Sequence, residues 1–313
     1  MTVPIKKIVI LDHNRGRLAN QLWNFMSIYA YCLEKGYRCE NYSFFDHADF
    51  FNVPLPKNPF VRWFFFGPFR NKKWFRRLRI YDRYLILMKR LYARSITVTD
   101  EEHPLRLPPT PALDQDQQER LASLEHNPSK TIYTVGWMFR DPVGLHKYRE
   151  AIIWYFMPKR SVTEKIESFI APVRAQYPHV VGVHIRQTDY EKKFGGGQYF
   201  FTQSEVRKIL DDYLRFFGKN IADTVFVICS DGPLDAAAFA GLNITMPHGT
   251  AVEDLFTLAR TDVIIGSNST YGPFASYYGN IPFMVFDRTN MEWEYYRDKT
   301  GYFENKKSTL VFY

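Results

Sequence analysis

Four short polar segments hold the side chains of this 313-residue chain that are best suited to chemistry. They supply a guanidinium, carboxylates, amides and hydroxyls, the groups that bind phosphate oxygens and the polar edges of nucleotides. The segments are N-R-G-R-L-A-N-Q at 14–21, H-I-R-Q-T-D-Y at 184–190, S-D-G at 230–232 and S-N-S-T at 267–270. Arg186 is the side chain that best fits bidentate binding of a phosphate.

Each polar segment follows a predicted strand or opens a predicted helix. Apolar spacing predicts strands at 6–11, 131–136, 179–184, 224–230, 262–267 and 282–286, and helices at 18–33, 143–156, 162–171, 203–216, 253–260 and 270–278. Their alternation from about 160 to 290 indicates a doubly wound parallel sheet. Such sheets bind ligands beyond the carboxyl ends of their strands, where helix N-termini also favour phosphate. The polar segments are therefore expected to form a nucleotide-diphosphate pocket.

Each of these signals also has a simpler explanation when it is taken alone. Arg186 could be a surface arginine at the end of a strand, and His184 could be a satisfied core residue. Ser230 with Asp231, and also the segment from Asn268 to Thr270, could merely cap a helix. Because all four segments lie at equivalent places in one predicted architecture, the pocket is the better interpretation.

The first half of the chain is less regular. The aromatic segment 42–51 is a candidate second strand, 112–125 is a polar helix, and Ser161 is a candidate N-cap for the helix at 162–171.

The composition is that of a globular protein, with 46% apolar residues and a formal charge of +8. This charge favours an anionic partner, such as nucleotide phosphate, nucleic acid or an anionic membrane. The three cysteines, Cys32, Cys39 and Cys229, fit no zinc motif and are expected to be reduced thiols in a cytoplasmic protein. No stretch reaches the ~20 apolar residues of a membrane span.

Residues 57–94 combine many Arg and Lys with Phe and Trp. This composition suits peripheral contact with an anionic membrane at its inner face, or stacking of single-stranded nucleic acid. It equally suits a domain face whose aromatic residues lie in the core and whose cations are solvated. Contact with the membrane is retained as an expectation, and nucleic acid is not an expected partner.

The polar segments resemble the motifs of the GDP-fucose-dependent fucosyltransferases. GRLANQLWNF at 16–25 resembles their GxxGNQ loop, HIRQTDY their H-x-R-x-x-D motif, and SDGPLDAAAF at 230–239 their S/T-D-D segment. DLFTLARTDVIIGSNSTYGPFASYYGN at 254–280 resembles the terminal motif of the α1,2-fucosyltransferases, glycosyltransferase family 11. The four motifs occur in the order found in that family, whereas residues 40–130 show no resemblance.

The resemblance implies an α/β fold of GT-B type, with two Rossmann-like domains facing across a cleft. It implies GDP-fucose as the donor substrate, a glycan as the acceptor, inversion at the anomeric carbon, no cofactor and no divalent metal. The expected domains are 1–158 for acceptor binding and 159–290 for the nucleotide sugar. A tail at 291–313 is expected to pack back on the first domain.

The resemblance also implies roles for single residues. It implies donor binding by Gly16, Gln21, His184, Arg186, Ser230, Asp231, Asp254, Asn268, Ser269 and Thr270, and catalytic roles for Arg186, Asp189 and Asn20. Arg186 is expected to hold the β-phosphate of the leaving GDP, and Asn20 to meet the diphosphate and fucose. His184 and Asp231 would face the nucleoside, with Asp231 accepting from guanine N–H groups. Ser269 and Thr270 would donate to phosphate oxygens.

The catalytic base is open between several carboxylates. Asp189 is the first choice because it lies three residues after Arg186, and Glu191 and Asp12 are rivals. Asp189 could instead only orient Arg186 through an ion pair. The Asp-x-Asp pattern at 114–116 is typical of metal sites in the other glycosyltransferase fold, but it lies in a polar helix with no strand before it. It is not expected to bind a metal.

Three departures from the family pattern bear on donor and linkage. Ala19 stands for a glycine, Gln187 for a second arginine, and Y-G-P-F at 271–274 for a pair of tryptophans. A GT-B glycosyltransferase that uses another nucleotide sugar therefore stays open as an alternative. A second alternative, which rests on the charge of +8 and on residues 57–94, is a non-enzymatic protein that binds polyanions or nucleic acid.

Overall fold

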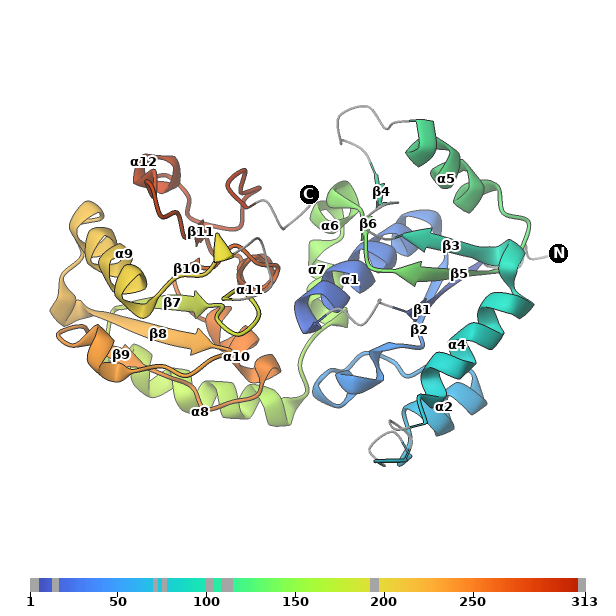
Figure 1. Ribbon diagram of the computed structural model, residues 1–313, viewed down its shortest axis with the longest axis horizontal. Helices are drawn as coiled ribbons and strands as arrows, with labels where there is room; N and C mark the ends of the chain where they lie inside the picture. Colours follow the sequence, from blue (N-terminus) through green and yellow to red (C-terminus); the bar gives the residue numbers. More distant parts are fainter. Residues whose placement is uncertain are drawn as a thin grey trace. The chain divides into compact units, whose positions relative to one another are not determined.

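The computed structural model describes residues 6–12, 17–69, 73–74, 78–99, 104–107, 115–191 and 197–308 (Figure 1). The described residues form two compact units, which divide between Lys159 and Arg160. Each unit is built around its own parallel sheet.

The first unit has a four-stranded parallel sheet with the order β2-β1-β5-β3. Its strands are β1 (Lys7–Asp12), β2 (Arg38–Asn41), β3 (Ile96–Thr99) and β5 (Thr131–Gly136), and β4 (Leu105–Arg106) pairs separately with β6 (Phe139–Arg140). Its α-helices are α1 (Leu18–Lys35), α2 (Pro59–Phe65), α4 (Ile80–Leu91), α5 (Gln115–His126), α6 (Pro142–Lys147) and α7 (Arg149–Tyr155). Short 3₁₀ turns occur at Phe44–Asp46, Ala48–Phe50 and Ala93–Ser95.

Two predictions for the first unit are wrong in detail. The second strand is Arg38–Asn41, before the aromatic segment, because the Asn41 side chain accepts from the backbone and hydroxyl of Ser43 and turns the chain. The aromatic residues that follow fill the core instead, as the contact between Phe44 and Phe51 shows. The helix predicted at 143–156 is divided at Tyr148, whose backbone leaves the helical region.

The second unit has a five-stranded parallel sheet with the order β11-β10-β7-β8-β9. Its strands are β7 (His179–Ile185), β8 (Thr224–Ser230), β9 (Ile244–Thr245), β10 (Val263–Gly266) and β11 (Phe283–Val285). Its helices are α8 (Arg160–Gln176), α9 (Gln203–Phe216), α10 (Ala251–Leu258), α11 (Tyr271–Gly279) and α12 (Trp293–Tyr296), with 3₁₀ turns at Ile221–Asp223 and Ala236–Phe239. This is the strand order of the dinucleotide-binding fold, and its direction reverses between β7 and β10.

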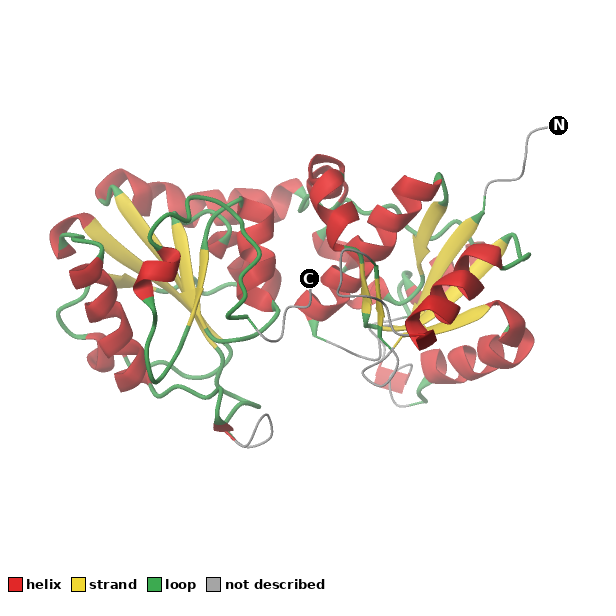
Figure 2. Ribbon diagram, turned by 90° about the horizontal axis from the view of Figure 1, so that it is seen from above, coloured by secondary structure: helices red, strands yellow, loops and turns green. Residues whose placement is uncertain are grey.

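The apolar runs of β7 and β8 are buried on both faces of this sheet. Val181 and Phe226 face the core shared with α9, whereas Val180 and Val225 pack with α8 on the opposite face. Figure 2 shows helices on both sides of the strands. Coverage on both sides explains why these strands read as nearly continuous apolar runs. Helix α8 begins at Arg160, so the prediction of Ser161 as its N-cap is wrong.

The chain beyond residue 290 continues to pack in the second unit. Met291 and Tyr296 belong to its apolar core, and the Asn305 amide donates to the Phe283 carbonyl at 2.7 Å. Residues 309–313 lie outside the described residues. Within the described parts of the chain, no helix has the length and apolar character needed to cross a bilayer.

Candidate active site

The reversal of strand order places the ends of β7 and β10 side by side. Ser267, directly after β10, donates its backbone N–H to the His184 carbonyl at 2.9 Å. Its hydroxyl oxygen accepts the backbone N–H of Arg186, also at 2.9 Å. Ser267 is fully buried, so these two bonds fix the point at which β7 stops and Arg186 begins the following loop. In doubly wound sheets this switch point is where ligands bind.

Close approach of the two strands requires a residue without a side chain on β10. Gly266 pairs with His184 in the sheet register. A Cβ atom on Gly266 would lie 2.9 Å from both the Cβ and the carbonyl oxygen of His184. Glycine at this position therefore allows the histidine to sit at the sheet edge.

The Arg186 guanidinium is held between two carboxylates. Its Nε and Nη2 donate to the two oxygens of Asp189 at 2.8 and 2.9 Å, and its Nη1 lies 2.9 Å from an oxygen of Asp231. The Tyr190 ring lies below it, with 5.5 Å between Cζ and the ring centre. These contacts use three of the five N–H groups of an arginine, so two are left for a ligand. The guanidinium is thus oriented in advance of any ligand.

Asp231 also braces the loop that carries Arg186. One of its oxygens accepts from the backbone N–H groups of Gln187 and Thr188 at 2.7 and 3.3 Å, and the other accepts from the Thr188 hydroxyl at 2.7 Å. Beside it, the Ser230 hydroxyl oxygen accepts from the Gly232 N–H at 3.1 Å. Asp231 was expected to face a nucleoside, whereas here both of its oxygens bind the 186–188 loop.

His184 is a buried, neutral imidazole. Burial, and then the nearby Arg186, lower the pKa of His184 to about 3. Its ring stacks on Tyr271 with 4.7 Å between ring centres, and the Tyr271 hydroxyl donates to the Ala251 carbonyl at 2.5 Å. The Nδ1 atom of His184 is buried and has no hydrogen-bond partner among the described residues. An unsatisfied buried nitrogen of this kind is suited to a ligand.

Asp254 has a second unsatisfied atom near the switch point, although its carboxylate also accepts a hydrogen bond from the Gly249 backbone. It lies in the first turn of α10, and burial, followed by the adjacent Glu253, raises the pKa of Asp254 to about 6. Its Oδ1 atom is buried without a hydrogen-bond partner in the described part of the structure. Asp254 and Arg186 both act electrostatically on the Tyr271 phenol, which connects Asp254 to the switch point.

Helix α11 begins directly after the switch point. Asn268 and Ser269 are buried there, and Thr270 is the N-cap residue. The Tyr190 hydroxyl donates to the Asn268 carbonyl at 2.9 Å, and the Ser269 hydroxyl oxygen accepts the Tyr271 N–H at 3.3 Å. The N-terminus of a helix carries partial positive charge and favours bound anions.

The remaining candidate residues belong to the first unit or follow the Arg186 loop. Asn20 and Gln21 are in the first turn of α1 in the first unit, where Asp12 ends β1, and Gly16 falls outside the described residues. Glu191 is exposed after the Arg186 loop.

In the Asp-x-Asp pattern, Asp114 lies outside the described residues and Asp116 forms an exposed ion pair with Arg120 at 2.8 Å. In the part of the chain that the structure describes, no group of three or more His, Cys, Asp or Glu side chains could hold a metal ion.

Sequence reasoning missed three residues that position this site: Ser267, Tyr190 and Tyr271. All three lie inside or directly beside the motifs, but their partners are distant in sequence. Tyr190 contacts Asn268, 78 residues away, and Ser267 contacts Arg186, 81 residues away. Proximity to a motif was the only available signal.

No protein family's sequence model matches this chain, and no curated protein matches it either. Solved structures do match. NodZ α-1,6-fucosyltransferase soaked with GDP-fucose has a TM-score of 0.53 and 16% identity, over 90% of this chain and 95% of that one; NodZ comes from Bradyrhizobium. POFUT1 in complex with GDP-fucose has a TM-score of 0.51 and 12% identity, over 91% and 98%. A mutant of Arabidopsis thaliana FUT1 in complex with GDP has a TM-score of 0.51 and 13% identity, over 92% and 73%.

The chain has the fold of these fucosyltransferases. The parallel sheets and βαβ connections match theirs over about nine-tenths of its length. The predicted α/β fold class of GT-B type is therefore confirmed. At these identities the likeness establishes the fold, and the chemistry must be argued from the site itself.

Proposed function

We propose that this protein is a fucosyltransferase that moves fucose from GDP-fucose to a hydroxyl of a glycan, with inversion at the anomeric carbon. The observation that carries the proposal is Arg186, fixed at the switch point of the second sheet with two N–H groups left for a ligand. Its support is the fold shared with fucosyltransferases whose structures contain GDP or GDP-fucose.

The donor would lie along the residues around the switch point. Arg186 binds the β-phosphate, and Ser269, Thr270 and the N-terminus of α11 donate to phosphate oxygens. His184 faces the nucleoside. Asp254 accepts from guanine N–H groups in place of Asp231, because it has a buried oxygen without a partner. Ser230 and Asn268 border this path, and the contribution of Asn20 and Gln21 stays a proposal from the sequence resemblance.

During transfer, a phosphate of the donor would replace Asp189 as a hydrogen-bond partner of the Arg186 guanidinium. The cluster of Arg186, Asp189 and Asp231 has a net charge of −1, from one cation and two anions, which opposes binding of a diphosphate. A phosphate that displaces Asp189 from the guanidinium removes this conflict and releases a carboxylate. The acceptor oxygen then bonds to C1 of fucose while its proton passes to Asp189, and the electron pair of the breaking C1–O bond leaves on GDP.

Positive charge for the leaving diphosphate would come from Arg186 and the α11 N-terminus, so we propose transfer without a divalent metal. Asp116 of the Asp-x-Asp pattern is already paired with Arg120. Transfer assayed in EDTA and then in Mg²⁺ or Mn²⁺ tests this point. Equal rates support it, and a loss in EDTA that Mg²⁺ or Mn²⁺ restores contradicts it.

The linkage formed is proposed to be α1,2, from the motif at 254–280. Gln187 replaces the second arginine of that family, and its backbone binds Asp231. NMR of the fucosylated product identifies the substituted carbon. A product substituted at another position would contradict the proposed α1,2 linkage, and the resemblance would then support the donor site alone.

The donor is tested by thermal shift with GDP, UDP and ADP on the wild type and on Arg186→Lys. GDP at 100 times its Kd should stabilise the wild type by ~2.7 kcal/mol. Arg186→Lys should lose most of this shift, because lysine lacks the planar fork. Stabilisation by UDP alone would support the alternative of another nucleotide sugar. No stabilisation by any nucleotide, together with salt-dependent binding of nucleic acid, would support the non-enzymatic alternative.

A second proposal concerns the membrane, because one face of the first unit exposes large apolar side chains. On α2, Phe60 and Trp63 are 55% and 59% exposed, and on α4, Leu87 and Leu91 are 51% and 64% exposed. Phe60 contacts Tyr84 at 6.2 Å between ring centres, and Tyr84 shares a helix face with both leucines. We call Phe60, Trp63, Leu87 and Leu91 the apolar face.

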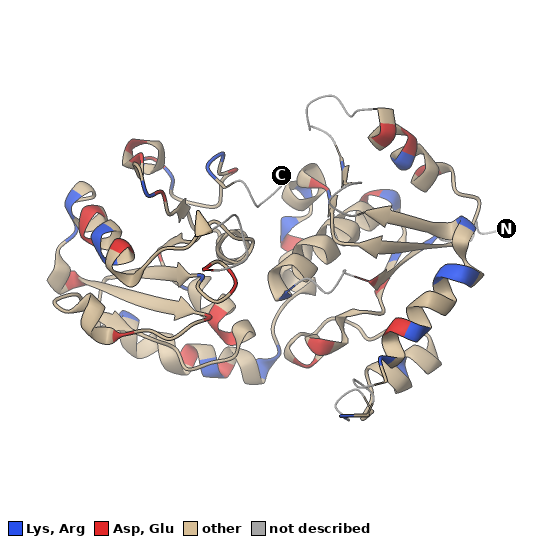
Figure 3. Ribbon diagram, in the orientation of Figure 1, with Lys and Arg blue, Asp and Glu red and all other residues tan. Residues whose placement is uncertain are grey.

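Basic residues surround the apolar face. Arg62 on α2 and Arg83, Lys89 and Arg90 on α4 are all exposed. Figure 3 shows the Lys and Arg positions of the chain in blue, several of them along α4. Apolar side chains bordered by cations are typical of helices that lie in the interface of an anionic bilayer. We propose that the apolar face makes peripheral contact with such a membrane, where a lipid-linked acceptor would be found.

A further inference from the structure

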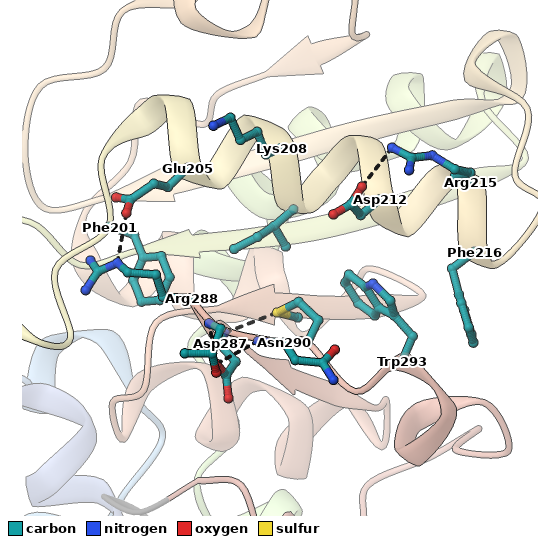
Figure 4. Close-up of a pocket in the computed structure, with 13 residues that line it drawn as sticks. Phe201, Glu205, Lys208, Asp212, Arg215, Phe216, Asp287, Arg288, Asn290 and Trp293 are labelled. Carbon is teal, nitrogen blue, oxygen red and sulfur yellow. Dashed lines mark hydrogen bonds and ion pairs between the residues drawn. The ribbon is translucent and has the colours of Figure 1, made fainter.

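The second unit contains a large cavity away from the switch point. Its volume is about 770 Å³, within the range of ligand pockets. Helix α9 forms one side, and the segment 287–293, which follows β11, forms the other (Figure 4). The lining residues are Phe201, Glu205, Lys208, Ile209, Asp212, Arg215, Phe216, Asp287, Arg288, Thr289, Asn290, Met291 and Trp293. None of them belongs to the Arg186 cluster.

A smaller cavity extends the first one towards the switch point. Its volume is about 260 Å³, and it shares Phe201, Asp287, Arg288, Asn290 and Met291 with the larger cavity. It is also lined by Asn268, the residue that follows Ser267. The two cavities are adjacent through these shared residues, and we call them together the α9 groove, which is lined from Asn268 to Phe216 near the end of α9.

The charges along the α9 groove nearly cancel. Arg288 forms an ion pair with Glu205 at 2.8 Å, and Arg215 forms one with Asp212 at 2.8 Å (Figure 4). The other charged residues of the larger cavity, Lys208 and Asp287, have opposite signs, so this cavity has three cations and three anions. The smaller cavity adds Lys307, which forms an ion pair with Glu292. The groove therefore has little excess charge that would select a phosphate, a nucleic acid or a polyanion.

Aromatic rings and polar groups both line the groove. Trp293 stacks on Phe216 with 6.3 Å between ring centres and an angle of 29°, and Tyr213 contacts its edge. Nearby, Asn290 is exposed and its Oδ1 accepts from the Glu292 N–H at 3.0 Å, which orients the amide. Sugar rings have apolar faces that pack on indole and phenyl rings, and hydroxyls that bond to amides and carboxylates.

We propose that the α9 groove, on the second unit and not within residues 1–158 as the sequence resemblance implies, binds the acceptor as a neutral oligosaccharide. Its reactive end lies near Asn268, and the following sugars extend along α9 towards Trp293. That this oligosaccharide is the acceptor rests on the proposed fucosyltransferase function, whereas the binding of a neutral oligosaccharide rests on the α9 groove alone. The groove thus selects a hydroxyl-rich, uncharged chain of several sugar units.

Binding is measured by saturation-transfer NMR and calorimetry with chitotetraose, lacto-N-tetraose and cellotetraose, and with an anionic heparin tetrasaccharide for comparison. At least one neutral tetrasaccharide should bind. Trp293→Ala should weaken its Kd about tenfold or more, and Trp293→Phe should restore most of the affinity because an aromatic face remains. Trp154→Ala, at a tryptophan that is 72% exposed in the first unit, is the matched control and should bind normally.

Asn290→Ala is a second test that spares the aromatic packing. It should also weaken binding of the tetrasaccharide, while the GDP thermal shift stays that of the wild type. The proposal is overturned if no neutral tetrasaccharide binds, if only the heparin fragment binds, or if Trp293→Ala and Asn290→Ala bind like the control. Binding of a neutral tetrasaccharide without any GDP shift would keep the groove and overturn the fucosyltransferase.

Discussion

Arg186 and Asp189 face each other through two parallel hydrogen bonds, from Nε to Oδ1 at 2.8 Å and from Nη2 to Oδ2 at 2.9 Å. The same planar fork is the geometry in which arginine binds phosphate. The Asp189 side chain is 34% exposed, so a ligand can reach it. Asp189 and a diphosphate therefore compete for one set of N–H groups, and the two roles considered for Asp189, base and brace, become successive states of one residue.

Asp189→Asn separates these roles. An amide does not take up a proton near neutral pH, so turnover should fall by about 10²–10⁴ if Asp189 is the base. GDP affinity should stay equal or rise, because a negative charge beside the diphosphate is removed. Steady-state kinetics give the first quantity and calorimetry with GDP gives the second. Unchanged turnover would leave Asp189 as a brace only, and Glu191→Gln, measured alongside, tests the rival that follows it in the loop.

Ser267→Ala should impair the site without touching a ligand. The partly buried Arg186 N–H loses its acceptor, which should lower the free energy of unfolding by about 1–3 kcal/mol. Arg186 should also be less well positioned, so turnover should fall more than GDP affinity. Urea unfolding and kinetics measure the two effects. Ser267→Thr retains the hydroxyl and should recover part of both, and full activity in Ser267→Ala would show that the backbone alone holds Arg186.

Asp254→Asn should change the pH dependence of stability. The pKa of Asp254 is about 6 in the folded chain, against an ordinary value of 3.8. The folded protein thus binds this proton more readily than the unfolded chain, and the stability from it is present below pH 3.8 and lost as pH rises through 6. Asparagine avoids burying the charge, so the variant should gain thermal stability relative to the wild type at pH 8 but not at pH 4. Thermal unfolding from pH 4 to 8 measures this, and a constant difference would contradict it.

His184→Asn should show the opposite dependence. The pKa of His184 falls from 6.5 to about 3 on folding, so the unfolded chain binds a proton that the folded chain does not. The wild type should therefore lose up to about 1.4 kcal/mol per pH unit from this residue as pH falls below 6.5. The variant loses the Tyr271 stack at every pH, but its deficit should shrink from pH 7 to pH 5. A deficit that grows instead would mean that His184 is protonated in the folded protein.

The second unit could be predicted well because its strands are fully buried and its helices amphipathic. Strand 224–230 and helix 203–216 have the predicted bounds, since continuous apolar runs and a 3.6-residue period leave few alternatives. In the first unit, tertiary contacts decide the outcome. The turn at Asn41 and Ser43 is the only local feature that separates the aromatic segment 42–51 from a strand, and it is the contact of Phe44 with Phe51 in the core that gives the segment its place.

The site was predictable by position and not by contact. The position of Arg186 after a predicted strand indicates that it binds a ligand. Its ion pair with Asp231, however, joins residues that follow different strands. No sequence periodicity predicts such a pair. The α9 groove had no signal at all. Strands β8 to β11 lie between Phe216 and Trp293 in the sequence, so their contact could not be predicted. Taken alone, each of the two has the sequence pattern of an ordinary core residue.

The apolar face should determine membrane association. Leu87→Ser with Leu91→Ser removes two exposed side chains of α4 that are not part of the described core. Partitioning onto vesicles with anionic lipid should fall about tenfold or more, because each buried leucine contributes about 1.5–3 kcal/mol. Co-sedimentation with anionic and with neutral vesicles measures this, and Trp154→Ser, at an exposed tryptophan outside the face, should behave as the wild type. Transfer to a soluble oligosaccharide should be unchanged in the double variant. Equal sedimentation with both vesicle types, or no effect of the double change, would mean that the apolar face is a solvated surface and does not bind membranes.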